Sequence, residues 1–354
     1  MATEVLQGLA MRKAQPGDAE VCGAICFDAF NSINMRHGFP CDFPGPEVAI
    51  SVLKMMFSHP HFYCLVAESE GRVVGSNCLD ERSIVAGVGP ITIDPQLQNR
   101  GIGRKLMNAV LDRAADRAIA GVRLVQAAFH SRSLSLYAGL GFDIREALSC
   151  MQGRTLQRSV AGCTVRAAQT QDVGACNAIA RQVHGFDRGQ ELSEAVQQST
   201  AVVVERGGRI SGYASSLSFF GHATAETNID LQALIASADS FGGPGILVPS
   251  RNSALFRWCL ANGLRVVQPM TLMTLGLYNE PAGAWLPSIL FKRHVLVSSL
   301  ACTNRLLRAR LSFEAAGAGT GVAATRGKIR ALYAKGHRAN RPVRLYPRRK
   351  LRWN

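Results

Sequence analysis

The sequence predicts an α/β fold that occurs twice, each copy an α+β sandwich with a mixed, mostly antiparallel sheet flanked by helices. Three observations predict it. A chain of 354 residues is long enough for two ordinary domains, short sequence blocks recur in the same order, and the same succession of strand and helix patterns surrounds each block. A hydrophobic content of 47% is enough for a core in each copy.

Three blocks carry the repeat. "MRKAQPGDAEVCGAI" at 11–25 aligns with "VRAAQTQDVGACNAI" at 165–179, with seven of fifteen positions identical. The pattern E-x-x-G-R-x-x-G begins at both Glu68 and Glu205, and "SRSLSLY" at 131–137 recurs as "SRNSALF" at 250–256. The repeat predicts domains at 1–155 and 160–292, followed by a tail at 293–354.

The elements of the first copy follow in order. A strand at 10–14 ends at Pro16-Gly17, and Asp18 is a good cap for the helix that comes next. "FYCLVAE" and "RVVGSNCL" flank "SEG" and predict a hairpin, and "VGPITID" is a further strand that ends at Asp94-Pro95. Residues 98–118 show apolar positions at helical spacing, and "VRLVQAAF", "SLSLYAGL" and "GFDI" read as strand, helix and strand.

Composition limits the classes of function. No apolar run approaches a membrane span, and the first residues lack the pattern of a secretory signal, so the expected location is the cytoplasm. Cys22 and Cys26 lie four residues apart, but no further Cys or His completes a zinc pattern. We therefore expect reduced cysteines and no metal site, with disulfides or a metal as the alternative.

The net charge of +15 comes from the end of the chain. Residues 293–354 hold 15 Lys and Arg and one acid, Glu314, so residues 1–292 carry only +1. A nucleic-acid partner is therefore not expected, except through this tail. The tail is a nucleic-acid or membrane-binding arm, a disordered extension, or the product of a shifted reading frame; the abrupt change in composition favours the third.

The stretch "DPQLQNRGIGRKLM" at 94–107 places two glycines at the start of a helix. Backbone N–H groups at a helix start lack partners and carry a partial positive charge, so they bind phosphate. Gly101 and Gly103 would let a pyrophosphate approach the backbone, while Arg100 and Arg104 add charge. Alternatively, Gly101 is only a loop residue and Gly103 allows close packing of helix on strand.

With Gln98 included, "QNRGIG" matches the pattern Q/R-x-x-G-x-G between a strand and a long helix, and here the chain resembles the GNAT family of N-acetyltransferases. "LYAGLGF" at 136–142 is similar to the family's late helix and strand, and the resemblance extends over the first copy. It implies acetyl-CoA as co-substrate. It implies phosphate binding by Gln98, Asn99, Arg100, Gly101, Ile102, Gly103 and Arg104, and pantetheine binding by Ile91, Thr92 and Ile93.

The resemblance also implies catalytic residues. Tyr137 would protonate the leaving thiolate as general acid; alternatively its ring only packs in the core. His130 stands where many relatives have an asparagine that contacts the cofactor, but a surface or capping role is equally consistent with its position.

A general base for the amine is less clearly marked. The strand "VRLVQAAF" has no acid, which leaves Asp80 and Glu81 in "CLDERS". Adjacent residues of a strand point to opposite faces, so at most one of them faces the cleft. The alternatives are an ion pair with Arg82 and deprotonation through water.

The second copy lacks this machinery. It has no G-x-G at its helix start, Phe256 replaces Tyr137, and it resembles the degenerate second domain of tandem GNAT proteins. We expect transfer of acetyl from acetyl-CoA to a primary amine of a small molecule or peptide; the alternative is a sensor that binds acyl-CoA without transfer. Residues 30–47 are either on the substrate side or a surface connection. The acceptor and the oligomeric state stay open.

Overall fold

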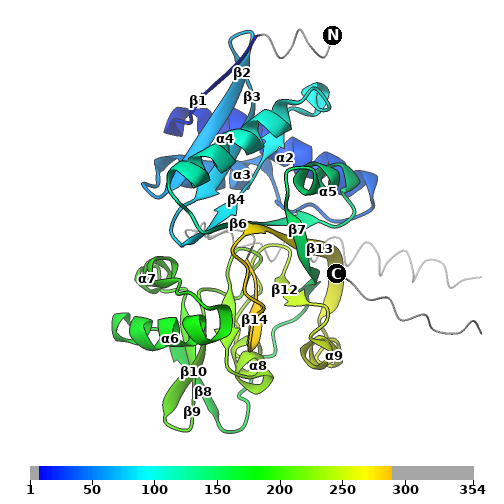
Figure 1. Ribbon diagram of the computed structural model, residues 1–354. Coiled ribbons are helices and arrows are strands. Elements are labelled where there is room, and N and C mark those ends of the chain that lie inside the picture. The colour runs from blue at the N-terminus through cyan, green and yellow to red at the C-terminus, as the bar shows by residue number, and fades with distance from the viewer. Residues whose placement is uncertain (1–7, 289–354) are drawn as a thin grey trace, which may run out of the picture. The chain divides into compact units, whose positions relative to one another are not determined.

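The computed structural model describes residues 8–288, which form two sheets with helices on their faces (Figure 1). The first sheet has nine strands, namely β1 (Leu9–Lys13), β2 (Phe62–Ser69), β3 (Arg72–Asp80), β4 (Val85–Val88), β5 (Thr92–Ile93), β6 (Gly121–Ala127), β7 (Asp143–Gln152), β12 (Ile246–Pro249) and β13 (Arg265–Gly276). Their order is β1-β2-β3-β4-β6-β13-β7-β12, with β5 paired to β3. The predicted α/β fold with mixed sheets flanked by helices is confirmed.

The second sheet has five strands in the order β14-β11-β10-β9-β8. Their bounds are β8 (Cys163–Ala167), β9 (Val202–Arg206), β10 (Arg209–Ala214), β11 (Ala223–Ala225) and β14 (Ala284–Leu286). Within this sheet every neighbouring pair is antiparallel.

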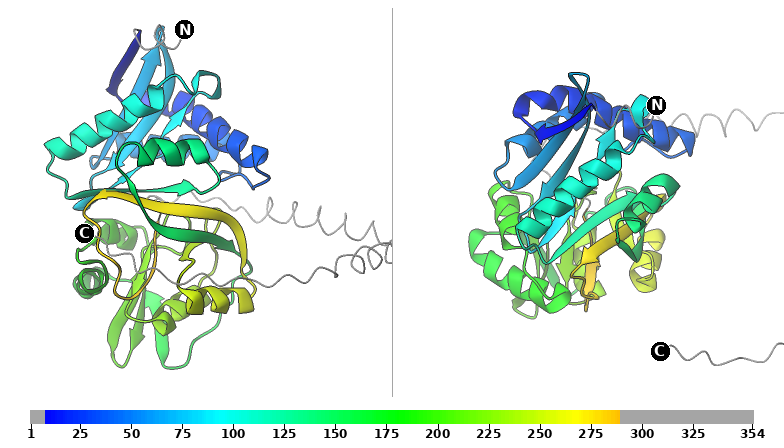
Figure 2. Two further views of the ribbon diagram at one scale, coloured as in Figure 1. Left: turned by 45° about the vertical axis from the view of Figure 1, so that its right-hand side comes forward. Right: turned by 45° about the horizontal axis from the view of Figure 1, so that its top comes forward.

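Helices cover both faces of the first sheet (Figure 2). Helices α2 (Ala19–Arg36) and α3 (Pro46–Ser58) bury one face, whereas α4 (Ile102–Asp116) and α5 (Ser131–Ala138) bury the other. In α4 the fully buried residues recur at helical spacing: Leu106, Met107, Val110 and Ala114. The second sheet has α6 (Val173–His184) and α7 (Gly189–Gln197) on one face and α8 (Asn228–Ala236) on the other, and α9 (Ser253–Ala261) packs with α8.

One strand of the second copy completes the sheet of the first. β13 lies between β6 and β7, with Met273 opposite Leu124 and Met270 opposite Leu148 (Figure 2). In return, β7 of the first copy lies between β13 and β12 of the second. Strands β12 and β13 of the second copy therefore join the first sheet, whereas the second sheet consists only of strands between residues 163 and 286.

The residues that reveal the repeat form the same network in both copies. Arg12 bonds to Asp18 at 2.7 Å and to Glu68 at 2.8 Å. Its counterpart Arg166 contacts the second copy's aspartate, Asp172, and glutamate, Glu205, both at 2.7 Å. The predicted capping by Asp18 needs correction, because its carboxylate accepts from Arg12 and from the Gln15 N–H and makes no cap bond to α2.

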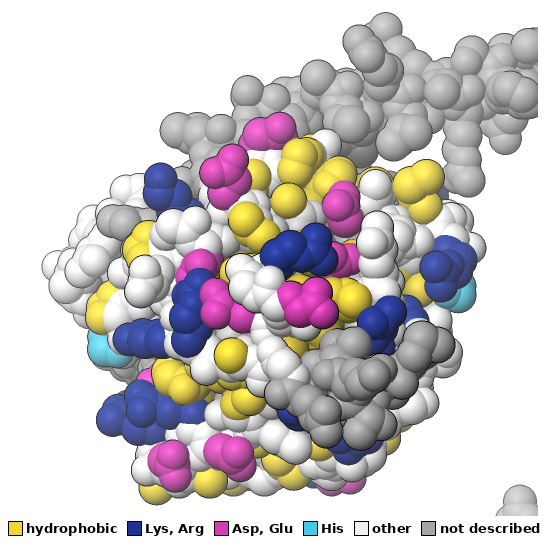
Figure 3. All heavy atoms as spheres, turned by 90° about the horizontal axis from the view of Figure 1, so that it is seen from above, with side chains coloured by type: hydrophobic (Ala, Val, Ile, Leu, Met, Phe, Trp, Pro, Cys, Tyr) yellow, Lys and Arg dark blue, Asp and Glu magenta, His cyan; other side chains and the backbone are white. Residues whose placement is uncertain are grey.

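Surface charge in the described part is mixed. On the face shown in Figure 3, Lys and Arg side chains are interspersed with Asp and Glu. This agrees with the near-neutral composition of residues 1–292. No helix between residues 8 and 288 has the length and apolar character needed to span a membrane. The basic tail predicted at 293–354 lies outside the described residues.

Candidate active site

The first sheet opens where β4 and β6 stop pairing. These parallel strands pair from Val85 with Gly121 to Gly87 with Arg123. One extra residue then bulges between β4 and β5. Leu79 of β3 lies opposite Val88 and Ser76 lies opposite Thr92, so a step of three residues on β3 matches a step of four on its partner. Beyond the bulge, β5 pairs with β3 alone among the described strands. Its other edge is therefore unpaired and faces the side on which β6 continues.

Backbone polar groups point into this unpaired edge. The Asp94 N–H donates to the Val74 carbonyl at 2.9 Å, which fixes the alternation of the antiparallel pair. Thr92 therefore directs its backbone groups to β3, whereas Ile91 and Ile93 direct theirs away from it. The Ile93 carbonyl accepts from the Gln98 side chain at 3.3 Å. The backbone groups of Ile91 and the N–H of Ile93 therefore point to the open edge, where they are available to an extended ligand.

The helix that follows begins without a cap. Gly101 is the N-cap of α4 with φ 83°, and no side chain caps the first turn. The first helical bond runs from the Lys105 N–H to the Gly101 carbonyl at 3.2 Å. The N–H groups of Ile102, Gly103 and Arg104 therefore have no partner in residues 8–288, and they carry the positive end of the helix dipole.

The loop before α4 is held by the next helix. Arg132 of α5 donates to the Gln98 Oε1 at 2.7 Å and to the Asn99 Oδ1 at 3.0 Å. Asn99 has φ 65°, so two left-handed residues lie within three positions of this turn, as in an anion-binding nest. Arg132 was not among the residues predicted from the sequence, and no pattern in "HSRSLS" marks it.

Of the remaining residues of the glycine stretch, the two arginines carry charge at the surface, whereas Gly103 and Ile102 pack against the sheet. Arg100 and Arg104 form no ion pair with any described residue, and the Arg104 side chain is exposed. A Cβ on Gly103 would lie 3.3 Å from the Ile93 Cδ1, so the close packing of helix on strand accounts for this glycine. Ile102 is a core residue.

Tyr137 is buried in α5, with 7% of its surface exposed and its ring 6.2 Å from that of Phe142. Burial raises the pKa of the phenol, so the hydroxyl keeps its proton throughout the physiological range. No described residue forms a hydrogen bond with this hydroxyl. The ring of Tyr137 therefore packs in the core, and its hydroxyl keeps a proton that it could donate.

His130 lies three residues after the end of β6 and is the N-cap residue of α5. Burial, with Arg132, His37 and Arg36 nearby, lowers its pKa to about 4, so the imidazole is neutral. Its Nε2 is buried without a hydrogen-bond partner in the described chain. The Gln126 Nε2 on β6 is also buried without a hydrogen-bond partner in the described chain. Gln126 was not among the predicted site residues, although an amide within the mainly apolar run "VRLVQAAF" indicates a polar role.

The two candidate bases are bound to arginines. Asp80 forms a bidentate pair with Arg82, which also contacts Glu194 of α7 at 2.7 Å. Glu81 pairs with Arg113 at 2.8 Å. Arg113 lies eleven residues beyond the start of α4, about 16 Å along the helix from its uncapped end. The expected ion pair with Arg82 is therefore confirmed for Asp80, whereas the partner of Glu81 is Arg113 and not Arg82.

The second copy closes the corresponding features with its own residues. The Thr227 hydroxyl accepts from the Asp230 N–H and forms a capping box at the start of α8. The strand edge of β11, which corresponds to the open edge of β5, pairs with β14 through Thr224 opposite Trp285. In addition, the Asp230 carboxylate would repel a phosphate.

The sheets and helices together define an α/β protein whose fold is shared with acetyltransferases. Residues 30–142 match the model of the Acetyltransferase (GNAT) family, which confirms the predicted resemblance for that segment. A putative acetyltransferase from Pyrococcus horikoshii is 20% identical, with 78% of this chain and 94% of that chain covered and a TM-score of 0.62.

Two further solved structures share the fold. A GCN5-related N-acetyltransferase from Sphaerobacter thermophilus is 15% identical over 77% of this chain and 96% of that chain, with a TM-score of 0.51. A tandem GNAT protein from the clavulanic acid biosynthesis pathway is 14% identical over 76% and 98%, with a TM-score of 0.50. The search of curated proteins returned no match.

Proposed function

We propose that this protein transfers an acetyl group from acetyl-CoA to a primary amine of a small molecule or peptide. The observation that carries the proposal is the uncapped start of α4 beside the unpaired edge of β5. The second copy supports this argument by contrast, because there Thr227 caps α8 and β14 pairs with the corresponding edge of β11.

The residues present fit acetyl-CoA. The three free N–H groups of Ile102, Gly103 and Arg104 would hold the pyrophosphate, with charge from Arg100 and Arg104. The outward backbone groups of Ile91 and Ile93 would pair with the pantetheine amides. The buried, unpartnered nitrogens of His130 and Gln126 would supply further polar contacts. When bound, acetyl-CoA supplies an activated thioester.

The proposed chemistry needs one proton donor. The amine nitrogen forms a bond to the acetyl carbon, the carbon–sulfur bond breaks, and the sulfur takes the proton of the Tyr137 phenol. Solvent then returns a proton to Tyr137. The proton of the amine passes to water, because Asp80 and Glu81 are occupied by Arg82 and Arg113.

We assign this chemistry to residues 1–155 and a supporting role to 160–292. The support is direct: β13 of the second copy pairs with both β6 and β7 beside the site. Phe256 of α9 corresponds to Tyr137 and offers no hydroxyl. The second copy thus shapes the sheet and binds no cofactor of its own.

A charge placed at the start of α4 tests the proposal. Aspartate tolerates φ > 0, so Gly101→Asp keeps the turn while capping the free N–H groups and repelling phosphate. We expect the affinity for CoA, measured by calorimetry, to fall about 100-fold. Gly71→Asp is the matched control, since Gly71 has φ 73° in the β2–β3 hairpin with open space around it.

Unchanged CoA affinity in Gly101→Asp would remove the assigned site. A thiol-release assay with acetyl-CoA and a broad panel of amines tests the transfer step on the intact chain. CoA binding without thiol release from any amine would instead identify an acyl-CoA sensor.

A further inference from the structure

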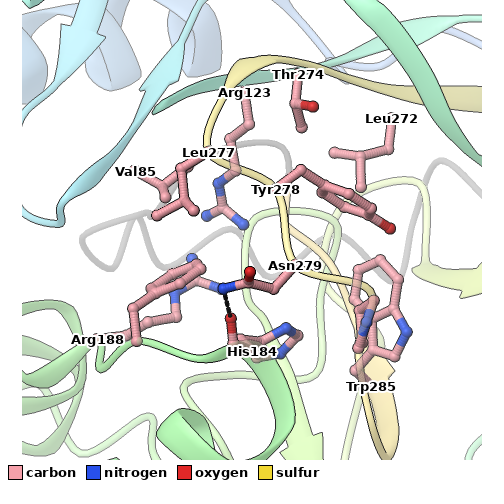
Figure 4. A pocket seen from close by; sticks show the side chains of 12 residues that line it. Val85, Arg123, His184, Arg188, Leu272, Thr274, Leu277, Tyr278, Asn279 and Trp285 are labelled. Carbon is pink, nitrogen blue, oxygen red and sulfur yellow. Dashed lines mark hydrogen bonds between the residues drawn. The ribbon is translucent and has the colours of Figure 1, made fainter. Parts of the chain in front are cut away.

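A cavity of about 40 Å³ adjoins the face of the first sheet that α2 and α3 cover further along. Its walls come from β6, β13, the start of α7 and the segment before β14 (Figure 4). Apolar walls are supplied by Leu272, Leu277 and Trp285, while Arg123 and Arg188 bring positive charge. The neighbouring His184 ring is neutral, because burial lowers its pKa well below the ordinary value.

Arg123 is an arginine without a counterion in contact. Figure 4 shows its guanidinium reaching into the cavity above Asn279 and His184. It forms no hydrogen bond or ion pair with any described residue, whereas Arg188 bonds to Glu191 at 2.6 Å. Burial lowers the pKa of Arg123 to about 10, and Arg188 adds to this effect.

The two acids that act on Arg123 through their charge, Glu191 and Asp80, are both bound by other arginines. Glu191 pairs with Arg188 at 2.6 Å. Asp80, Gly87 and Arg123 stand in one row across β3, β4 and β6. Asp80 is thus two strands away, about 10 Å by strand spacing, and both its oxygens are bound by Arg82. The guanidinium keeps five donors for a ligand in a setting where an unpaired charge is costly.

Arg123 also lies where the proposed chemistry would occur. The pair Gly87–Arg123 is the last rung of the β4–β6 ladder. A pantetheine arm that runs along Ile93 and Ile91 from the start of α4 ends at this narrow point. The next residue on the same face of β6, Val125, packs in the core with α2 and α3, so the cavity opens beside that core.

We propose that Arg123 binds a carboxylate of the acceptor, so that the acceptor is a small amino acid-like amine with an apolar side chain. This inference rests on the proposed acetyl transfer. The fixed fork of a guanidinium matches a carboxylate, and the carboxylate must lie only a few bonds from the amine because Arg123 is at the end of the ladder. The apolar walls receive the side chain.

Matched ligands test the carboxylate on the intact chain. L-Phenylalanine and L-leucine are each compared with the amino acid amide and with the decarboxylated amine, by calorimetry and by thiol release with acetyl-CoA. We expect the acids to bind about 10- to 100-fold more tightly than their neutral partners. Arg123→Met abolishes that difference, and Arg257→Met, which removes an exposed arginine from α9, preserves it.

Thermal unfolding supplies a readout independent of turnover. Without ligand, Arg123→Met raises Tm, because a half-buried charge without a counterion in contact is replaced by an apolar chain of similar length. A lower Tm, or equal binding of acids and neutral amines by the wild type, overturns the proposal, as does a panel in which neither acid binds. Binding of acids that depends on Arg123 without thiol release supports this site and counts against acetyl transfer.

Discussion

The identities shared by the two copies serve the fold and not the chemistry. Arg12 and Arg166 each join a strand to the acid that precedes the first helix and to a glutamate on the neighbouring strand. In contrast, Tyr137 and the glycine turn, which would carry the chemistry, have no equivalent in the second copy. The residues that make the repeat visible in the sequence are therefore the ones on which both sheets depend.

These pairs predict acid sensitivity. Arg12 and Arg166 hold the pKa of Asp18 and Asp172 below 3.8, so the folded state binds fewer protons than the unfolded state. The stabilisation is present above the unfolded pKa and is lost as pH falls through and below 4. We expect about 1 kcal/mol from each pair, discounted for the partial exposure of the arginines. Tm measured from pH 7 to pH 3 should fall less in Asp18→Asn/Asp172→Asn, which starts lower; parallel curves would contradict the prediction.

Tyr137 gives a second prediction at this scale. Tyr137→Phe keeps the buried ring and removes only the proton, so we expect kcat to fall about 100-fold while CoA affinity is unchanged. Since burial raises the phenol pKa, the wild-type rate should show no loss at alkaline pH up to about 10 from this group. Tyr63→Phe, on β2 beside Arg113, is the control. Equal kcat in the two variants would give Tyr137 a packing role only.

At the level of elements, local pattern predicted what each segment forms but not what it pairs with. The hydrophobic periodicity of 98–118 and the glycine turn place α4 and its free N–H groups correctly, because these features depend on neighbours in sequence. The partners of β13 could not be read in the same way. Its apolar run "MTLMTLG" would fit between any two strands. The residues next to it in sequence do not determine that Met273 lies opposite Leu124.

Residues of the site that depend on distant contacts were missed for the same reason. The pair of Asp80 with Arg82 is local and was one of the alternatives, but the pair of Glu81 with Arg113 joins residues 32 positions apart. The cavity beside Arg123 exists only because the segment before β14 folds back. The pairing of β14 with β11 could not be predicted from the sequence either, although the absence of the G-x-G pattern had already distinguished the second copy from the first.

For the molecule as a whole, the two strands that the second copy adds to the first sheet, β12 and β13, join the stability of the two copies. Removal of β13 would leave β6 and β7 with open edges, which expose unpaired backbone groups and favour aggregation. It would also take away Leu272 and Met273 of β13, which pack on the two faces of the first sheet. The first copy should therefore not be an independent folding unit, even though its motifs are contiguous in sequence.

Truncation tests this coupling. We expect residues 1–155 alone to be aggregated or unfolded by circular dichroism, and residues 1–288 to unfold in one cooperative thermal transition with intact CoA binding. Co-expression of 1–155 with 156–288 should restore a folded complex, because β13 can insert from a separate chain as it does from the same one. If 1–155 alone keeps the Tm and the CoA affinity of 1–288, β13 is dispensable and the second copy contributes nothing to the site.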